Sequence, residues 1–174
     1  MSDQVLKWCV WDLKAQAEHD PESNCVLVTT DSKLAAQLAP DVGDVPGYLV
    51  VCAGGWEEVA VVIEAFAPEH LELMGPGPQS LAKKIRNAGA VFVGPLSAIA
   101  LGDYIAGPSH VLPTGGSARS FSGLWTGSFM RVHSVININA KEFWPLATAG
   151  ETLALSEGLP VHAESLAVRR RTLS

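Results

Sequence analysis

Apolar positions follow two alternating patterns along the first half of the chain. Val5, Trp8, Cys9 and Leu13 recur with a helical period near the N-terminus, with charged residues between them. Short runs that are apolar on both sides separate the helical segments, and such runs are typical of strands buried on both faces. Strands are predicted at 24–30, 48–52, 89–94 and 134–138, and helices at 5–15, 33–38, 56–66, 81–87, 143–157 and 165–171. This alternation predicts an α/β fold with a parallel sheet covered by helices.

Two features indicate where the chain changes character. Residues 99–124 are rich in Gly, Ser, Pro and Thr and predict a long loop, which inside a compact domain usually carries function. Asp31 is expected to cap the helix at 33–38, and Pro40 to follow its end. We expect an α/β domain at residues 1–140 and a helical extension at 141–174.

The composition excludes several classes of protein. A chain of 174 residues with 48% hydrophobic and 17% charged residues predicts one packed domain with a small appendage. A net charge of −6 argues against nucleic-acid binding, which needs a basic stripe. No apolar run approaches a membrane span and no signal segment opens the chain, so we expect a cytoplasmic protein. The three cysteines lack metal-like spacing, and Cys25 and Cys52 are predicted to be buried.

Several polar residues are candidates for chemistry, although each also has an ordinary interpretation. Gln16 and His19 are three residues apart on a predicted helix and share a face, but most such pairs are surface residues. Glu69 and His70 place a carboxylate beside an imidazole, as a general acid or base near neutral pH requires. A helix-terminal charge with an incidental histidine explains that pair equally well.

The remaining candidates lie in turn-rich sequence. Asp103 precedes a Gly-Pro pair and could simply form a turn, and His110 could be a ligand, a substrate contact or a structural residue. His162 follows Gly-Leu-Pro and is expected in a connector between helices. His133 has no supporting context. Two imidazoles with oxygen donors would suit Zn²⁺.

Five longer segments give these residues a common context. In order along the chain, they resemble the L-histidinol dehydrogenase family over residues 12–170. The segments are Gln16–Pro21, Phe66–Glu72, Asn87–Ala90, Gly102–Thr114 and Glu157–Ala163. The family is Zn²⁺-dependent and NAD-linked, and it oxidises histidinol through the aldehyde to histidine.

The resemblance implies a role for each candidate. The zinc ligands fall on Gln16, His19, Asp103 and His162, and His162 reaches the site of a partner subunit, which implies an intertwined homodimer with shared metal sites. His70 matches the general base and Glu69 the group that activates water. The positions that match substrate contacts are His110 and Glu157.

The chain resembles only the C-terminal part of the family. The preceding region, which makes most contacts to NAD, has no counterpart, and no glycine-rich GxGxxG motif follows a predicted strand. The implied fold is a partial Rossmann-like, three-layer α/β/α domain, half of a nucleotide-fold-like domain, with a C-terminal helical appendage that reaches a partner subunit. We do not expect NAD to bind to this chain alone.

Three functions therefore remain open. The first is a zinc enzyme that performs hydration, hydrolysis, elimination, isomerisation or cyclisation on a small amine or imidazole ligand. The second is the catalytic half of an NAD-dependent histidinol dehydrogenase that needs a separate NAD-binding chain. The third is a zinc-dependent binding or regulatory protein without turnover.

Overall fold

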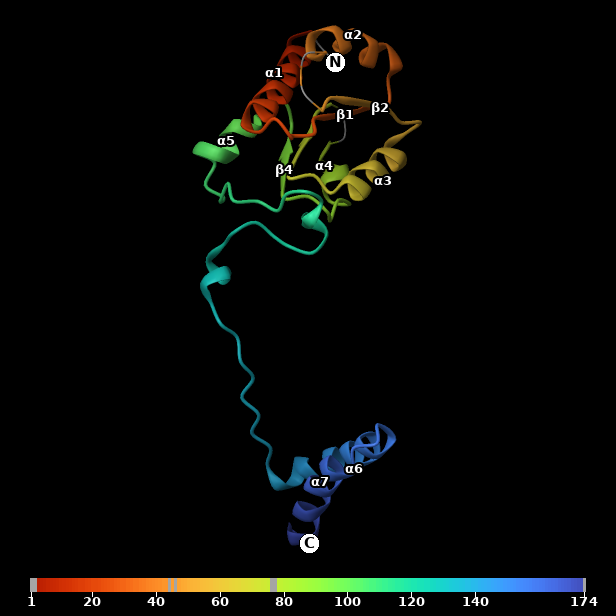
Figure 1. Ribbon diagram of the computed structural model, residues 1–174, viewed down its shortest axis with the longest axis vertical. Coiled ribbons are helices and arrows are strands. Elements are labelled where there is room, and N and C mark those ends of the chain that lie inside the picture. Colours follow the sequence, from red (N-terminus) through yellow and green to blue (C-terminus); the bar gives the residue numbers. More distant parts are fainter. Residues whose placement is uncertain (1–2, 44, 46, 76–77, 174) are drawn as a thin grey trace. The chain divides into compact units, whose positions relative to one another are not determined.

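The computed structural model describes residues 3–43, 45, 47–75 and 78–173. The chain divides into two compact units, residues 1–130 and 131–174 (Figure 1). The elements of the first unit are α1 (Asp3–His19), β1 (Val26–Thr29), α2 (Ser32–Val42), β2 (Leu49–Cys52), α3 (Trp56–Phe66), β3 (His70–Leu73), α4 (Pro78–Ala82), β4 (Ala90–Val93) and α5 (Ile99–Tyr104). The second unit contains α6 (Ala140–Ser156) and α7 (Pro160–Leu173).

The strands of the first unit form parallel pairs. β1 pairs with β2 and β3 pairs with β4, with Val26 opposite Leu49 and His70 opposite Ala90. The parallel direction and the α/β class are as predicted. Among the described residues, however, the strands are hydrogen-bonded as two separate two-stranded sheets and not as one continuous sheet.

Two apolar clusters stabilise this unit from opposite sides of β1. Leu27 packs against a cluster formed by α1 and α2, whereas its neighbour Val28 packs against a cluster formed by α3, β3 and α4. Because successive strand residues point to opposite faces, β1 is covered by helices on both sides. The buried residues of the cluster with α1 and α2 are Leu6, Val10, Cys25, Leu38, Val42 and Val45. Those of the cluster with α3, β3 and α4 are Ala53, Val59, Ile63, Leu71, Leu73 and Leu81. Cys25 is buried as predicted, whereas the side chain of Cys52 lies outside the described part.

The helix α2 is longer than predicted. Asp31 caps it as expected, since its carboxylate accepts hydrogen bonds from the N–H groups of Lys33 and Leu34. The helix then continues through Pro40 to Val42, where we expected an end near Leu38. Leu38 and Val42 are both almost fully buried, and the burial of one more apolar turn offsets the hydrogen bond that proline removes.

Two elements of the second strand pair also differ from the predictions. The helix predicted at 81–87 is instead the short α4, because the Glu64 carboxylate accepts hydrogen bonds from the N–H groups of Arg86 and Asn87 at 2.6 and 3.2 Å and holds them in a turn. The strand β3 was not predicted at all. Its four residues, His70–Leu73, alternate between polar and apolar and follow closely on α3, so they give only a short pattern.

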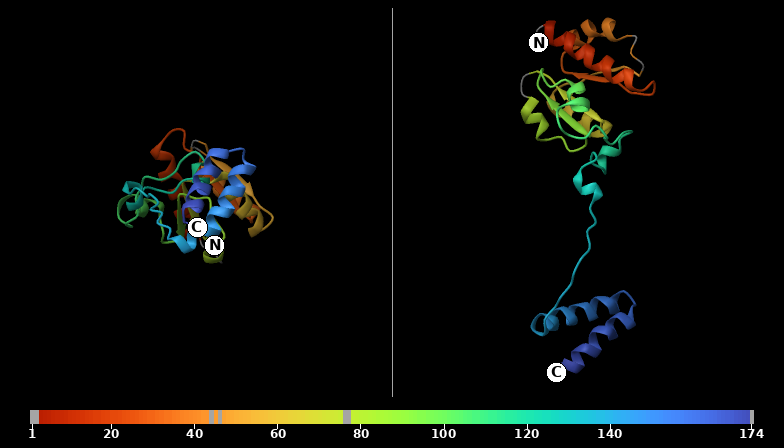
Figure 2. Two further views of the ribbon diagram at one scale, coloured as in Figure 1. Left: turned by 90° about the horizontal axis from the view of Figure 1, so that it is seen from below. Right: turned by 90° about the vertical axis from the view of Figure 1, so that its left-hand side faces the viewer.

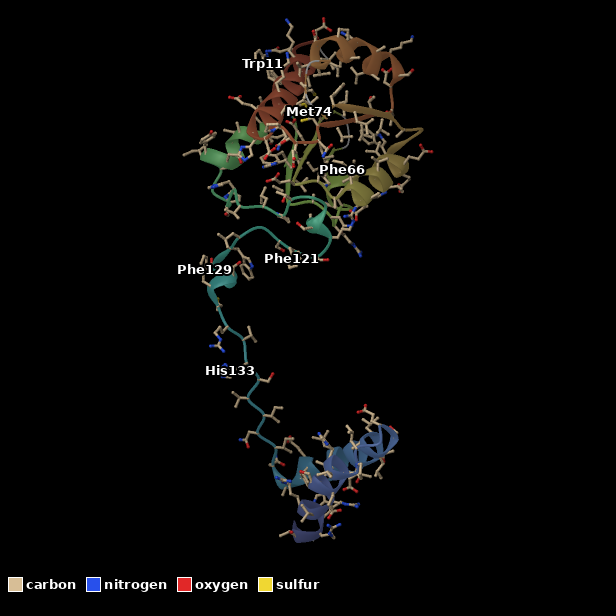
Figure 3. All side chains as sticks on the ribbon, viewed as in Figure 1. Trp11, Phe66, Met74, Phe121, Phe129 and His133 are labelled. Atoms are coloured by element: carbon tan, nitrogen blue, oxygen red, sulfur yellow. The ribbon has the colours of Figure 1, made fainter. Side chains whose placement is uncertain are left out.

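The irregular stretch after β4 begins later than predicted. Residues 99–104, expected to open a loop, form α5, so Asp103 lies on a helix and not in a turn. From Ile105 to Leu124 the chain is irregular apart from a 3₁₀ turn at Ser117–Arg119. Phe121 and Phe129 extend from this stretch and from the next 3₁₀ turn (Figure 3).

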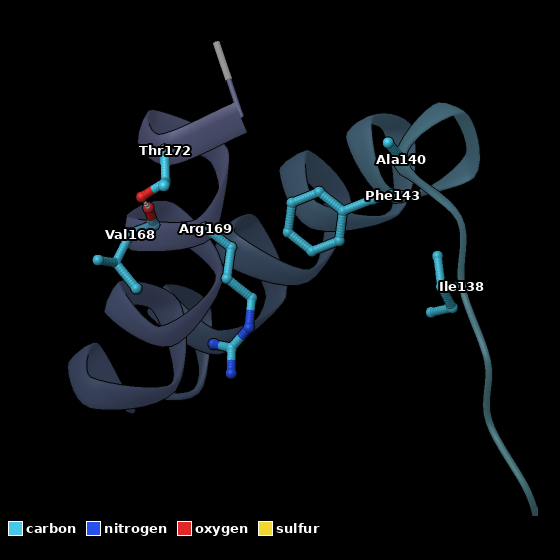
Figure 4. A pocket seen from close by; sticks show the side chains of 6 residues that line it. All are labelled: Ile138, Ala140, Phe143, Val168, Arg169 and Thr172. Carbon is cyan, nitrogen blue, oxygen red and sulfur yellow. Dashed lines mark hydrogen bonds between the residues drawn. The ribbon is translucent and has the colours of Figure 1, made fainter.

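The second unit is a hairpin of two helices. Asn139 caps α6 by accepting a hydrogen bond from the N–H of Glu142, and Gly158, with φ of 74°, connects α6 to α7. Figure 2 shows the two helices side by side. Phe143 of α6 and Arg169 of α7 lie toward one another in an open groove that Ile138 borders (Figure 4).

Two predictions for this second region were wrong. Residues 134–138, predicted as a strand, are extended but form no strand in the described structure, because no neighbouring backbone there offers hydrogen bonds. Val135 and Ile136 are accordingly exposed. His162 belongs to the first turn of α7 and not to a connector. None of the described helices combines the length and apolar character needed to cross a membrane.

Candidate metal and acid–base site

The strand β3 has one apolar and one polar face. Leu71 and Leu73 are buried in the cluster with α3, so His70 and Glu72 point the other way, and Met74 follows them on that side. The polar face of β3 therefore presents an imidazole, a carboxyl group and a thioether in a row.

The helix α1 crosses this polar face in the opposite direction to the strand. The Cys9 thiol donates to the Met74 sulfur at 3.0 Å, and one helical turn later the Asp12 side chain interacts with Glu72. One turn of α1 advances about 5.4 Å along the helix, and two residues of β3 advance about 6.6 Å along the strand. Side chains one turn apart on α1 therefore stay approximately opposite side chains two residues apart on β3. From this register we infer that Gln16, the next residue on this face, lies near the level of His70.

His70 is the centre of the site. Its side chain is 8% exposed, with Nδ1 3.9 Å from Glu69 Oε2 and Nε2 3.7 Å from Asp103 Oδ1. Neither ring nitrogen has a hydrogen-bond partner among the described groups, although both are buried. Because unpartnered buried nitrogens are costly, this ring is placed to exchange a proton or to contact a ligand.

Packing around Phe92 brings Asp103 to His70. The His70 and Phe92 ring centroids are 5.9 Å apart, and a Cβ added to Gly102 would lie 2.5 Å from Cζ of Phe92. Only glycine therefore allows α5 to approach β4 this closely. Asp103, the next residue, consequently comes within 3.7 Å of the imidazole.

Burial changes the protonation of the neighbouring groups. Burial, followed by the charge of Asp12, raises the pKa of Glu72 to about 8. Burial likewise raises the pKa of Asp12, and it raises that of the Cys9 thiol to about 11. At neutral pH, Glu72 and Cys9 are therefore predominantly protonated, and Cys9 is not a reactive thiolate.

The structure brings together some of the candidate residues. Glu69, His70 and Asp103 converge, whereas Gln16 and His19 lie on the last turns of α1, partly and fully exposed. His110 is exposed in the irregular stretch. Within the described part of the chain, no three His, Cys, Asp or Glu side chains converge closely enough to hold a metal ion.

Two candidates belong to the second unit. Glu157 is the C-terminal cap of α6, and His162 is exposed on the first turn of α7. Both side chains are accessible within this unit, so both are available to another surface.

Four residues of this region were not among the candidates: Asp12, Glu72, Phe92 and Gly102. Asp12 precedes Gln16 by one helical turn, so the pattern that paired Gln16 with His19 also placed Asp12 on their face. Glu72 could have been found only once β3 was recognised. Nothing local marked the contact between Gly102 and Phe92.

The fold and site together define an α/β protein with an imidazole–carboxylate centre beside a helix that carries candidate metal donors. The model of the family described as histidinol dehydrogenase matches residues 2–170, so the chain belongs to the histidinol dehydrogenase family.

Individual relatives agree with this assignment. The histidinol dehydrogenase of a Synechococcus strain is 40% identical over 182 residues, which cover 96% of this chain and 42% of the relative. That of Methanopyrus kandleri is 40% identical over 179 residues, which cover 94% of this chain and 42% of the relative. A crystal structure of histidinol dehydrogenase from Elizabethkingia anophelis matches with a TM-score of 0.85 and 28% identity, over 97% of this chain and 42% of that one. The chain thus spans about two fifths of the length of the relatives it matches.

Proposed function

We propose that this chain performs zinc-dependent general acid–base chemistry on a small ligand that contains an amine or an imidazole. The observation that carries this proposal is the buried His70 ring between two carboxylates, with both nitrogens free of partners among the described groups. Hydration, hydrolysis, elimination, isomerisation and cyclisation are all reactions that such a centre serves without a hydride acceptor.

The donor types of the proposed ligands fit a borderline cation. Gln16, His19 and Asp103 supply an amide oxygen, an imidazole and a carboxylate, and the register of α1 against β3 supports a position of Gln16 near the level of His70. The unpartnered nitrogens of His70 lie beside this set. Bound Zn²⁺ would supply a Lewis acid that polarises a polar group of the ligand.

The proton transfer falls to His70. Its buried ring takes a proton from the ligand, and the Glu69 carboxylate near Nδ1 stabilises the imidazolium that results. The Glu69 side chain is more exposed than His70 (24% against 8%), so it is also positioned to activate a water molecule. We assign ligand contact to His110 and Glu157 on the resemblance alone.

A second copy of the chain completes the site in this proposal. The fourth zinc ligand is the partner subunit's His162, so the protein is a homodimer with shared metal sites. The exposure of His162 on α7 supports this, as does the exposed apolar run before α6, in which Val135 and Ile136 are 83% and 80% exposed.

Metal analysis of untagged protein tests the ligand set. We expect about one zinc per subunit in the wild type and zinc loss in both His19→Ala and His162→Ala. Mixing the two variants under exchange conditions should restore one intact site per hybrid dimer, whereas His133→Ala should behave as wild type. Undiminished zinc in the His19→Ala, His162→Ala double variant would reject the ligand set, and a strict monomer at micromolar concentration would reject the sharing.

The catalytic half of an NAD-dependent dehydrogenase is the second candidate, and the named relatives favour it. The chain aligns along nearly its whole length with proteins called histidinol dehydrogenase. In this case His70 and Glu69 act on histidinol, and a separate NAD-binding chain supplies the hydride acceptor. NADH formation from histidinol by the purified chain alone would exclude the non-redox proposal, and zinc-dependent binding of histidinol without any product would favour a regulatory protein.

A further inference from the structure

Two carboxyl groups face each other where α1 crosses β3. The Asp12 and Glu72 side chains interact directly, and Glu72 Oε1 is buried without a hydrogen-bond partner among the described groups. The backbone N–H of Ile99, the first residue of α5, also faces Asp12 and lowers the pKa of its carboxyl group. The proposed chemistry uses neither carboxyl group, so their burial needs a separate explanation.

Protonation of one of the two carboxyl groups removes the repulsion between them. Two carboxyl groups in contact share a proton, because both cannot be ionised at this distance. Burial raises the pKa of Glu72 most, to about 8, so Glu72 keeps the proton and its O–H donates to the Asp12 carboxylate. Cys9 is the other titratable group of α1 that faces Glu72, and its thiol stays neutral. In the described part of the chain, no cation affects the pKa of either carboxyl group.

The pair connects the three elements that carry the proposed site. Asp12 belongs to α1, which bears Gln16 and His19, and its carboxyl group lies beside the backbone N–H that begins α5, which bears Asp103. Glu72 belongs to β3, which bears His70. A shift of α1 by one residue along β3 would break this contact and move Gln16 about 1.5 Å away from its level with His70.

We propose that Asp12 and Glu72 form a proton-sharing pair that fixes α1 against β3 and α5 and so positions Gln16 and His19 for zinc. They are positioning residues and not zinc ligands. This inference rests on the proposed zinc site, since it assigns a role in assembling that site.

Amide and apolar replacements of Glu72 in the full chain separate positioning from simple packing. In Glu72→Gln the amide N–H replaces the shared proton and donates to Asp12, so zinc affinity should stay within about threefold of the wild type. In Glu72→Leu the side chain keeps its size but cannot donate, and zinc affinity should fall about 10–100-fold, as when groups that orient ligands are removed. Glu22→Gln, an exposed carboxylate beyond the end of α1, is the matched control and should change nothing.

Zinc affinity is measured by chelator competition, and thermal stability is measured separately in the metal-free protein. If Glu72→Leu lowers the melting temperature but leaves zinc affinity unchanged, the pair is merely structural and the positioning role is wrong. Equal loss of affinity in Glu72→Gln and Glu72→Leu also overturns it, because the hydrogen bond would then be irrelevant. Absence of zinc binding by the wild type would instead reject the proposed function itself.

Discussion

The two units of the chain bury their apolar side chains to very different extents. The first unit has two clusters, mainly of Leu, Val and Ile, contributed by six helices and strands and the turns between them. The buried positions described in the second are alanines, Ala147, Ala163 and Ala167, whereas Val132 is 97% exposed. Because burial contributes roughly 25 cal/mol per Å², alanines stabilise the hairpin far less than the larger residues stabilise the first unit.

This difference teaches which unit depends on other surfaces. The hairpin adds an ion pair between Arg170 and Glu151 at 2.9 Å, but two helices alone are only marginally stable. The first unit holds the candidate acid–base residues, Glu69 and His70, on a core of its own. We infer that the second unit gains its stability, and its part in the site, from contact with another chain.

The largest expected effect is on turnover, which should depend on His70 in the first unit and not on His133 in the second. His70→Ala in the first unit should reduce turnover about 10²–10⁴-fold while zinc content stays unchanged, because it removes the general base but no proposed ligand. His133→Ala in the second unit is the matched control and should retain full turnover. Steady-state kinetics on whichever substrate is found provides the measurement. Normal turnover of His70→Ala would remove the acid–base mechanism.

The next effect concerns stability. Leu38 on α2 is 2% exposed, so Leu38→Ala should lower the unfolding free energy by about 2–5 kcal/mol. Ile136→Ser, at an exposed position, should change it by no more than about 0.5 kcal/mol in the monomer, yet weaken the dimer. Urea unfolding and sedimentation over a range of concentrations give the two values. Similar losses of monomer stability in both variants would contradict the comparison.

Local sequence patterns anticipated the first unit better than the second. α1, α3 and three of the strands were predictable because their apolar residues pack within a few turns of one another. The strand at 134–138 was predicted from the same kind of pattern, but a strand also needs a neighbouring backbone, which composition does not reveal. Proline similarly misled at α2, where tertiary burial outweighs its local effect.

The family resemblance pointed to the candidate site residues, and the structure brings only Glu69, His70 and Asp103 together. His70 and Asp103 are 33 positions apart, and the glycine that lets them meet is marked only by its contact with Phe92. The Asp12–Glu72 pair was likewise invisible without β3. Long-range packing, which no local pattern encodes, is the reason in both cases.

Gly102→Ala tests that packing directly. The added Cβ would lie 2.5 Å from the Phe92 ring, so we expect a loss of about 1–3 kcal/mol in unfolding free energy. Zinc affinity should fall as well, because Asp103 moves with α5. Gly55→Ala, where a Cβ would meet nothing within 4 Å, should cost only the difference between a glycine and an alanine N-cap, about 0.5–1 kcal/mol, and should leave zinc affinity unchanged. Recovery of stability when Phe92→Leu is added would confirm the contact, and additive losses would argue against it.

The smallest effect is the pH dependence of the first unit. The native pKa of Glu72 is raised from 4.5 to about 8, so between these values the native state binds more protons than the unfolded state. The contribution of Glu72 is thus complete below about pH 4.5, declines as pH rises, and levels off above about pH 8. The total change should stay well below what these two pKa values alone imply, because the side chain is only partly buried and solvent screens it.

Glu72→Gln cannot titrate and isolates this contribution. The difference in unfolding free energy between Glu72→Gln and the wild type should grow from pH 5 to pH 8 and then stay constant to pH 9. Groups elsewhere that are the same in both proteins cancel in this difference. Urea unfolding of metal-free protein at pH 5, 7, 8 and 9 measures the difference. A difference that is constant over this range would show that Glu72 is ionised throughout, and Asp12 and Glu72 could then share no proton.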